Sequence, residues 1–200
     1  NYSKAPYASE PSSTITYAEC HDNHVLWDKL AISAKDATES ERKEMHKLAL
    51  SIVLTSQGIS FLHAGTEFLR SKMGHENSFN AGDSINAIDW SLKTKNKDVF
   101  DYVKTLIKMR KEHTAFRMRT AKEIVENIRF LDNMPQGVVG YIINGESVND
   151  KWKKILIYFN GTPDSPTISF PEKLKRSFFI GHDPYGNIPA VKDILILPGF

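Results

Sequence analysis

The first 64 residues place one long helical pattern between two short β-branched stretches, and this order restricts the fold more than any other feature. Residues 14–18 carry the β-branched and aromatic side chains that favour a strand, and residues 59–64 have the same character. A strand, a helix and a strand in this order predict parallel β/α architecture. Between the two stretches, apolar side chains recur at helical spacing along residues 39–56: Met45, Leu48, Ala49, Ile52 and Val53.

The sequence also marks both ends of this helix. Thr38 and Glu41 have the spacing of a capping box, in which each side chain bonds a backbone N–H group of the other residue. Gly58 favours the end of the helix, because glycine adopts the left-handed backbone conformation without strain. We expect the strand that follows, residues 59–64, to be buried.

A second helix is expected next, and the pattern then changes. Beyond Thr114, short strand patterns are separated by turn-forming residues, which is typical of an all-β domain. We predict a β-sandwich there, which the chain leaves incomplete, and divide the sequence into domains of residues 1–116 and 117–200. The helix covers residues 98–113, with a buried face of Val99, Tyr102, Val103, Leu106, Ile107 and Met109. The strand patterns are residues 124–130, 138–143, 154–159, 177–180 and 194–197.

Composition argues against several classes of partner. The chain of 200 residues has a formal net charge of +2, and its Lys and Arg residues are scattered. It therefore indicates neither nucleic acid nor an anionic membrane surface as a partner. No apolar run approaches the roughly 20 residues that cross a bilayer. The single cysteine, Cys20, cannot form an internal disulfide, and nothing in the sequence indicates a cell compartment.

A polar cluster follows the first predicted strand at its carboxyl end. Parallel α/β sheets and barrels bind their ligands at these ends of strands, and His21 and Asp22 stand there side by side. A carboxylate in this place can accept hydrogen bonds from sugar hydroxyl groups and stabilise an oxocarbenium-like transition state. A structural alternative is a turn in which Asp22 and Asn23 bond the backbone.

Metal binding is a further alternative for this cluster. His21, Asp22 and His24 are all metal-ligand types, but the adjacent His-Asp pair of metal-dependent phosphohydrolases belongs on a helix, whereas this pair follows a strand. We therefore predict no metal site. Three further residues raise the same question, and we favour structural roles for them: His63, Glu67 and His75. Three aromatic residues could stack on sugars, although large aromatic side chains more often lie in the core: Trp27, Phe79 and Trp90.

The amino-acid sequences of three segments resemble those of a known family. Residues 17–30, YAECHDNHVLWDKL, resemble the segment after barrel strand seven of type I pullulanases, which belong to glycoside hydrolase family 13 of the α-amylase superfamily. Residues 58–90 resemble barrel strand eight with its loop, and residues 106–117 resemble the last barrel helix. The resemblance implies the last two strand-helix units of a (β/α)₈ TIM barrel, followed by the family's C-terminal β-sandwich domain.

The resemblance also implies an activity. It is the retaining cleavage of α-1,6-glucosidic linkages in pullulan, starch or glycogen, with Asp22 as the transition-state stabiliser and His21 binding the cleaved glucose. The family's nucleophilic aspartate and acid glutamate lie on strands four and five, outside this chain, so we expect the chain alone to be inactive. No cofactor is implied, and calcium binding by the full-length protein stays open. The implied substrate-binding residues are Asn77, Asn80, Asp83, Asn23 and Trp27.

Two other functions remain as alternatives. A relative within the same family could act on α-1,4-linkages, as α-amylases do. A non-catalytic carbohydrate-binding module could instead be built on the β-rich half of the chain, with Trp152 or Tyr158 as an aromatic platform. Residues 17–30 favour the pullulanase interpretation.

We predict that the chain self-associates. Two strand-helix units alone leave a sheet edge and an apolar helix face uncovered. Sedimentation velocity ultracentrifugation of the 200-residue chain should therefore show species larger than the monomer, in amounts that rise with concentration. A single monomeric species that unfolds cooperatively would contradict this prediction.

Overall fold

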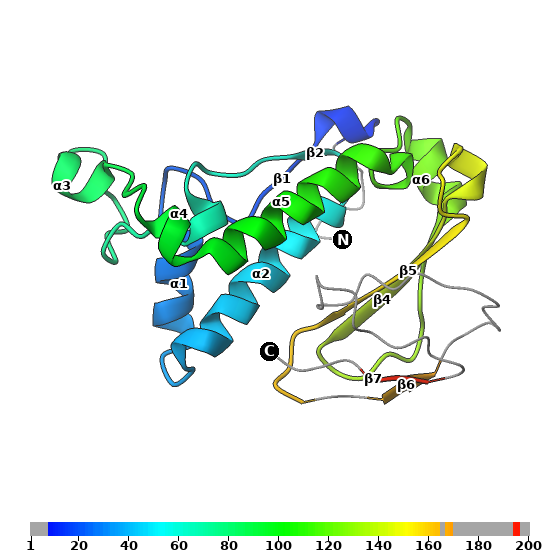
Figure 1. The fold of residues 1–200 in the computed structure, drawn as a ribbon. Coiled ribbons are helices and arrows are strands. Elements are labelled where there is room, and N and C mark those ends of the chain that lie inside the picture. Colours follow the sequence, from blue (N-terminus) through cyan, green and yellow to red (C-terminus); the bar gives the residue numbers. More distant parts are fainter. Residues whose placement is uncertain (1–7, 165–166, 170–193, 197–200) are drawn as a thin grey trace. The chain divides into compact units, whose positions relative to one another are not determined.

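The computed structural model describes residues 8–164, 167–169 and 194–196, and these residues form two compact units (Figure 1). We call residues 16–55 and 60–108 the helical unit. The strand-rich unit contains the described residues within the ranges 1–15, 56–59 and 109–200. Among the helices that the structure describes, none combines the length and the apolar character that a membrane span requires.

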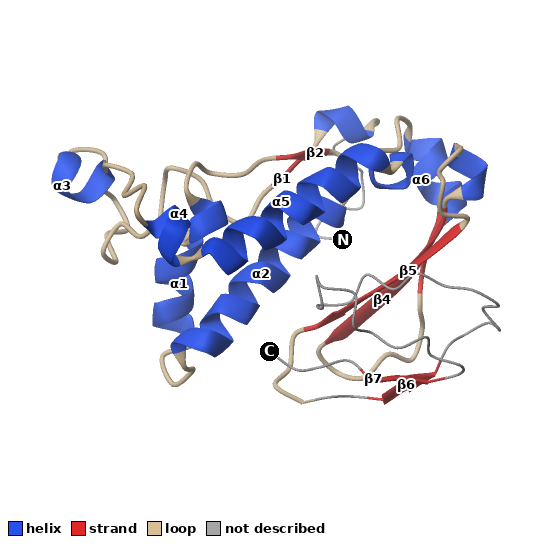
Figure 2. Cartoon of the chain, in the orientation of Figure 1, coloured by secondary structure: helices blue, strands red, loops and turns tan. Residues whose placement is uncertain are grey.

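The helical unit contains most of the helices, which Figure 2 distinguishes from the strands. They are α1 (Leu26–Ser33), α2 (Glu39–Thr55), the 3-10 helix η2 (Thr66–Phe68), α3 (Asp83–Asn86), α4 (Leu92–Lys95) and α5 (Lys97–Glu112), whose last turn belongs to the other unit. Helices α2 and α5 lie side by side, and the hydroxyl groups of Ser51 and Tyr102 meet between them at 2.5 Å.

Two short strands, β1 (Ile15–Thr16) and β2 (Ile59–Ser60), form a separate sheet. The Ile59 N–H donates to the carbonyl of Thr14, and two residues further the Phe61 N–H donates to the carbonyl of Thr16, both at 3.0 Å. The bonds advance in the same direction along both strands, so the strands are parallel. The predicted order of strand, helix and parallel strand is therefore present.

Helix α2 begins with the predicted capping box. Glu41 accepts from the Thr38 N–H, and Thr38 Oγ1 accepts from the Glu41 N–H. Of the apolar stripe predicted along this helix, however, only Val53 is buried. The residues that are buried follow the same spacing one position further along the helix: His46, Leu50, Val53 and Leu54. Residues 48–54 are apolar on both faces of the helix, so the spacing alone could not choose between them; the predicted Met45, Leu48, Ala49 and Ile52 are partly or largely exposed.

Two further predictions about burial need correction. Residues 59–64 do not form a buried strand, because Ile59 and Phe61 are about half exposed. The reason is that β2 pairs with β1 alone in the described part of the chain, which leaves little to cover its faces. Helix α5 was predicted correctly, and its buried residues include Val99, Val103 and Leu106, but Ile107 is exposed.

The strand-rich unit is built around an antiparallel sheet in the order β3-β4-β5. Strand β4 pairs with β5 along its whole length, from Val138 opposite Asn160 to Asn144 opposite Lys154. A second, two-stranded antiparallel sheet consists of β6 and β7. The elements of this unit are η1 (Pro11–Ser13), η3 (Thr114–Phe116), α6 (Ala121–Asn127), β3 (Ile128–Phe130), β4 (Val138–Asn144), η4 (Glu146–Val148), β5 (Lys154–Asn160), β6 (Thr167–Ser169) and β7 (Ile194–Ile196).

The predictions for this unit hold in part. Strands β4 and β5 are confirmed, and β7 lies where residues 194–197 predicted a strand. Residues 124–127 were wrongly predicted as strand, because a capping box between Thr120 and Glu123 begins helix α6 there and delays β3 to residue 128. The predicted strand over residues 177–180 lies outside the described residues. The β-sandwich arrangement and the boundary at residue 116 stay predictions.

A buried ion pair joins the end of α5 to the connection between β4 and β5. The side chain of Asp150 is fully buried, and its Oδ1 atom lies 2.7 Å from Nδ1 of His113. The carboxylate also accepts from the N–H groups of Ala115 at 2.9 Å and Trp152 at 2.8 Å, and the His113 ring stacks on Trp152. Burial acts to raise the pKa of Asp150, but these hydrogen bonds outweigh it and hold the pKa below the ordinary value.

We predict that Asp150→Asn destabilises the chain. The amide cannot pair with His113 and accept from two N–H groups in the same way, so the free energy of unfolding should fall by about 2–3 kcal/mol at neutral pH. Urea denaturation measures this difference. Asp132→Asn is the matched control, because Asp132 is exposed in the same unit.

The effect should also depend on pH. The pKa of Asp150 is lower in the folded state than its ordinary value of 3.8, so its contribution is present above that pH and is lost as the pH falls through the folded pKa. The difference between the wild type and Asp150→Asn should therefore shrink in acid. Equal unfolding free energies of the two proteins at pH 7 would contradict the assignment.

Candidate functional site

The candidate site lies in the loop that follows β1. His21 and Asp22 stand next to each other, with 3.3 Å between His21 Nδ1 and Asp22 Oδ1, and their side chains are 84% and 71% exposed. Asn23 completes the turn with a left-handed φ of 61° and is also exposed. All three side chains are therefore accessible to a ligand.

Glu19 closes this loop at its base. Its buried carboxylate accepts a hydrogen bond from the backbone N–H of Leu26, the first residue of α1. Burial raises the pKa of Glu19, and the polar contacts with Thr66 and Leu26 oppose that rise. Glu19 thereby joins the end of β1 to the start of α1, and the residues between them form a short closed loop.

Lys72 fixes the backbone of this loop. Its side chain is among the most buried of the described residues, with 1% exposed, and its ammonium donates to the carbonyl groups of His21 and Asn23, both at 3.0 Å. These carbonyls lie on either side of Asp22. The backbone that carries the exposed carboxylate is therefore held by a buried charge through charge-assisted hydrogen bonds.

Asp28 on α1 holds the segment that carries Lys72. Its buried carboxylate accepts from Ser71 Oγ at 2.6 Å and from the N–H groups of Lys72 at 2.8 Å and Gly74 at 3.0 Å. The carboxylate thus fixes residues 71–74, and Lys72 in turn fixes the loop of His21. We call this pair of interactions the Asp28–Lys72 clamp.

Arg70 organises the end of the second strand. Its guanidinium donates to the carbonyls of Ala64 at 3.1 Å and Asn86 at 2.6 Å, and it approaches His63 Nε2 at 3.4 Å. Gly65 has a φ of 95°, and a Cβ atom there would lie 2.8 Å from the Cβ of Arg70. Glycine is therefore needed at this position for its backbone conformation and for its lack of a side chain.

The ends of the two strands influence each other electrostatically. Burial lowers the pKa of His63, and the positive charges of Arg70, Lys72 and His21 lower it further. His63 therefore shares its surroundings with the loop of His21, and it is disposed to stay neutral. The structural role expected for His63 from the sequence stays a prediction.

The loop with the remaining predicted sugar-binding residues is separate. Asn77, Asn80 and Asp83 are all exposed, and Asp83 begins α3. Among the described residues, no hydrogen bond or ion pair joins them to His21 or Asp22. The structure thus brings His21, Asp22 and Asn23 together and places the other three on a second loop.

Trp27 lies on α1 and contacts α2. The Trp27 ring packs edge to face against the buried His46 ring, with 6.2 Å between ring centroids. The guanidinium of Arg42 lies 5.7 Å from the centroid of the Trp27 ring. Its described partners are thus packing partners. The described residues contain no group of three His, Cys, Asp or Glu side chains that could hold a metal ion.

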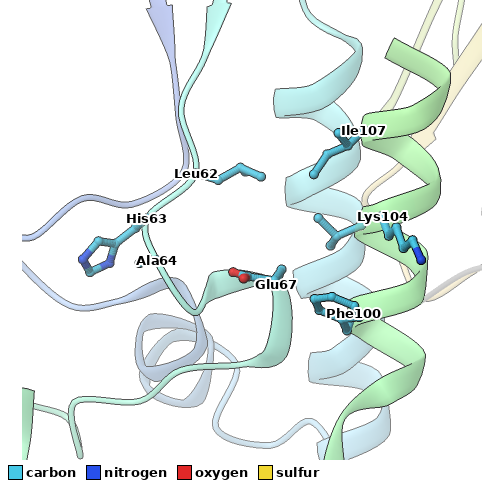
Figure 3. Close-up of a pocket in the computed structure, with 8 residues that line it drawn as sticks. Leu62, His63, Ala64, Glu67, Phe100, Lys104 and Ile107 are labelled. Carbon is cyan, nitrogen blue, oxygen red and sulfur yellow. The ribbon is translucent and has the colours of Figure 1, made fainter. Parts of the chain in front are cut away.

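A cavity of about 300 Å³ lies between the end of β2 and helix α5 (Figure 3). Its walls are mainly apolar, and Figure 3 shows the His63 ring turned away from the helix. Neither His21 nor Asp22 lines it, so we do not assign the site to this cavity. Its lining residues are Leu62, His63, Ala64, Glu67, Phe100, Val103, Lys104 and Ile107.

Comparison with known proteins gives consistent matches. Residues 124–175 match the family described as pullulanase, all-beta domain. The chain is 36% identical over 170 residues to the pullulanase of Bacillus subtilis (strain 168), which covers 85% of this chain and 24% of that protein.

Solved structures agree with the sequence matches. A pullulanase from Anoxybacillus sp. LM18-11, complexed with maltotetraose, superposes with a TM-score of 0.87 at 34% identity, covering 96% of this chain and 27% of that one. The type I pullulanase of Bacillus subtilis str. 168, complexed with maltose, gives a TM-score of 0.88 at 32% identity, covering 100% and 28%. The chain thus spans about a quarter of the length of these pullulanases.

We predict that Lys72→Met loosens the loop of His21. Methionine fills most of the same buried space but leaves the two carbonyls without their donor, and we expect local opening to become easier by about 2 kcal/mol. Amide hydrogen exchange at Leu26, whose N–H closes the same loop on Glu19, should then be about 30-fold faster.

Lys97→Met is the matched control, because the exposed ammonium of Lys97 pairs with Asp101 on the surface of α5. That substitution should leave exchange in the loop unchanged. Unaltered exchange in Lys72→Met would show that Lys72 does not hold the loop.

Proposed function

Since this chain belongs to the pullulanase family, we propose that it forms part of a glycoside hydrolase that cleaves α-1,6-glucosidic linkages in pullulan, starch or glycogen with retention. The observation that carries the proposal is the exposed carboxylate of Asp22 at the carboxyl end of a parallel strand. Lys72 fixes the backbone on either side of it by bonding the carbonyls of His21 and Asn23. The similarity to pullulanases complexed with maltotetraose and maltotriose supports α-glucan as the substrate class.

We propose that the two strands and their helices are consecutive units of a (β/α)₈ barrel. Strand β1 is followed by α1 and α2, strand β2 is followed by α5, and the strands are parallel. Catalytic residues of such barrels lie in the loops after the carboxyl ends of the strands. The loop of His21 and Asp22 is in that position after β1, and the segment of His63 to Arg70 is in it after β2.

Asp22 has the role of transition-state stabiliser in this proposal. Cleavage of a glycosidic bond develops positive charge on the sugar ring, and a fixed carboxylate beside the ring lowers the energy of that state. The Asp28–Lys72 clamp supports this role, because a carboxylate on a fixed backbone needs little reorganisation during the reaction.

His21 and the second loop have binding roles in the same proposal. His21 Nδ1 faces Asp22, which leaves its Nε2 atom available to a sugar hydroxyl group of the cleaved glucose. The exposed amides of Asn77 and Asn80 and the carboxylate of Asp83 offer further hydrogen bonds to sugar. Asn23 supports the site through its turn and Trp27 through its packing on α2.

The nucleophile and the general acid come from outside these 200 residues in our proposal, because a retaining hydrolase needs both in addition to Asp22. This agrees with the chain's span of about a quarter of its relatives. The chain on its own is then inactive, and the chemistry needs no cofactor.

We predict that Asp22→Asn nearly abolishes turnover of pullulan by the enzyme that contains this chain. The amide has almost the same shape but lacks the charge that complements the transition state, so kcat should fall by a factor of about 10²–10³ or more. The melting temperature should stay the same, because Asp22 is exposed. Kinetics of reducing-sugar release and a thermal unfolding curve measure the two effects.

Asp36→Asn provides the control, because Asp36 is an exposed aspartate in the connection between α1 and α2. Its kcat should equal that of the wild type. Near-normal turnover in Asp22→Asn would refute the role of Asp22. Hydrolysis of amylose instead of pullulan would refute the proposed linkage, and pullulan hydrolysis by the 200-residue chain alone would refute the proposal that two carboxylates are supplied from elsewhere.

A further inference from the structure

Phe79 is the most exposed of the large apolar side chains in the described residues, with 83% of the residue accessible. It lies in the loop between Asn77 and Asp83. Within the same part of the chain its ring has no aromatic or cationic neighbour, whereas the exposed ring of Trp90 packs against Phe68 with 5.7 Å between centroids. The face of Phe79 is thus free for a ligand.

The backbone next to this ring is fixed. The carbonyl of the buried Ser78 accepts from the Ala81 N–H at 3.0 Å and from Asn86 Nδ2 at 2.6 Å. Asn86 in turn accepts from Arg70, which bonds the carbonyl of Ala64 at the end of the second strand. A chain of hydrogen bonds therefore connects Phe79's neighbour to the strand end, while Phe79 itself turns toward solvent.

The surroundings of the ring indicate which ligand it fits. An aromatic face presents a large, rigid apolar surface that loses little entropy on binding. Asn77 and Asn80 flank Phe79 in the sequence, and their exposed amides can donate and accept hydrogen bonds. A pyranose ring has the complementary form, with an apolar face of C–H groups and a rim of hydroxyl groups.

We propose that Phe79 is the stacking platform of an α-glucan subsite, with Asn77 and Asn80 bonding the hydroxyl groups of the stacked sugar. This inference rests on the proposed function for its substrate class. It goes further by assigning to the second loop an apolar contact with a glucose ring. The subsite is distinct from the cavity beside α5, whose lining does not include Phe79.

The test measures binding of maltotriose to the enzyme that contains this chain, by isothermal titration calorimetry. Maltotriose has no α-1,6-linkage, so the measurement reports binding without cleavage. Phe79→Ala should weaken binding about tenfold, Phe79→Leu should weaken it nearly as much because leucine has no flat face, and Phe79→Trp should keep it within about twofold of the wild type. All three variants should melt at the wild-type temperature, because the side chain is exposed.

Phe130→Ala is the matched control, because Phe130 is an exposed phenylalanine on β3 in the strand-rich unit. It should bind maltotriose as the wild type does. Wild-type affinity in Phe79→Ala, equal losses in Phe79→Trp and Phe79→Ala, or no binding by the wild type would each overturn the platform. Binding that depends on the Phe79 ring in an enzyme that leaves α-1,6-linkages intact would support the platform and refute the proposed function.

Discussion

The buried ammonium of Lys72 is the interaction on which the candidate site depends. A charge this far from solvent is favourable only where polar groups replace its water, and the two carbonyls beside Asp22 do so. Because Asp28 accepts from the backbone N–H groups of Lys72 itself and of Gly74, the segment that carries the charge is also held in place from α1. The exposed pair of His21 and Asp22 therefore sits on a rigid base, even though the two side chains themselves have few contacts.

The sequence predicted the elements that depend on local patterns. Thr38 and Glu41 marked the start of α2 through neighbouring residues, and the strand order around this helix followed from β-branched composition. Where two local signals competed, prediction was wrong. Ile124 and Val125 favour a strand, but the capping box of Thr120 and Glu123 starts a helix there, which is a choice between propensities of similar strength.

The candidate site divides in the same way. His21 and Asp22 could be named as candidates from their position after a predicted strand, together with the sequence of residues 17–30. Lys72 and Asp28 could not, because a lysine in a loop and an aspartate in the first turn of a helix are common surface residues. Only the fold brings residues so far apart in the sequence together and removes them from water. Arg70 could not be identified from the sequence for the same reason, although Gly65 is the residue type that the close approach of the Arg70 side chain requires.

The clamp acts on carbonyl groups, and every residue has one. The shape of the turn is therefore largely independent of which side chains occupy positions 21 and 22, whereas position 23 is restricted to residues that tolerate its left-handed backbone, chiefly Asn, Asp and Gly. The contacts that fix the backbone of the turn are in this sense independent of the side chains that it exposes. A designer could exchange the two outward-facing groups for others and expect the new ones to be presented in the same direction, which makes the turn a mount for alternative chemistries.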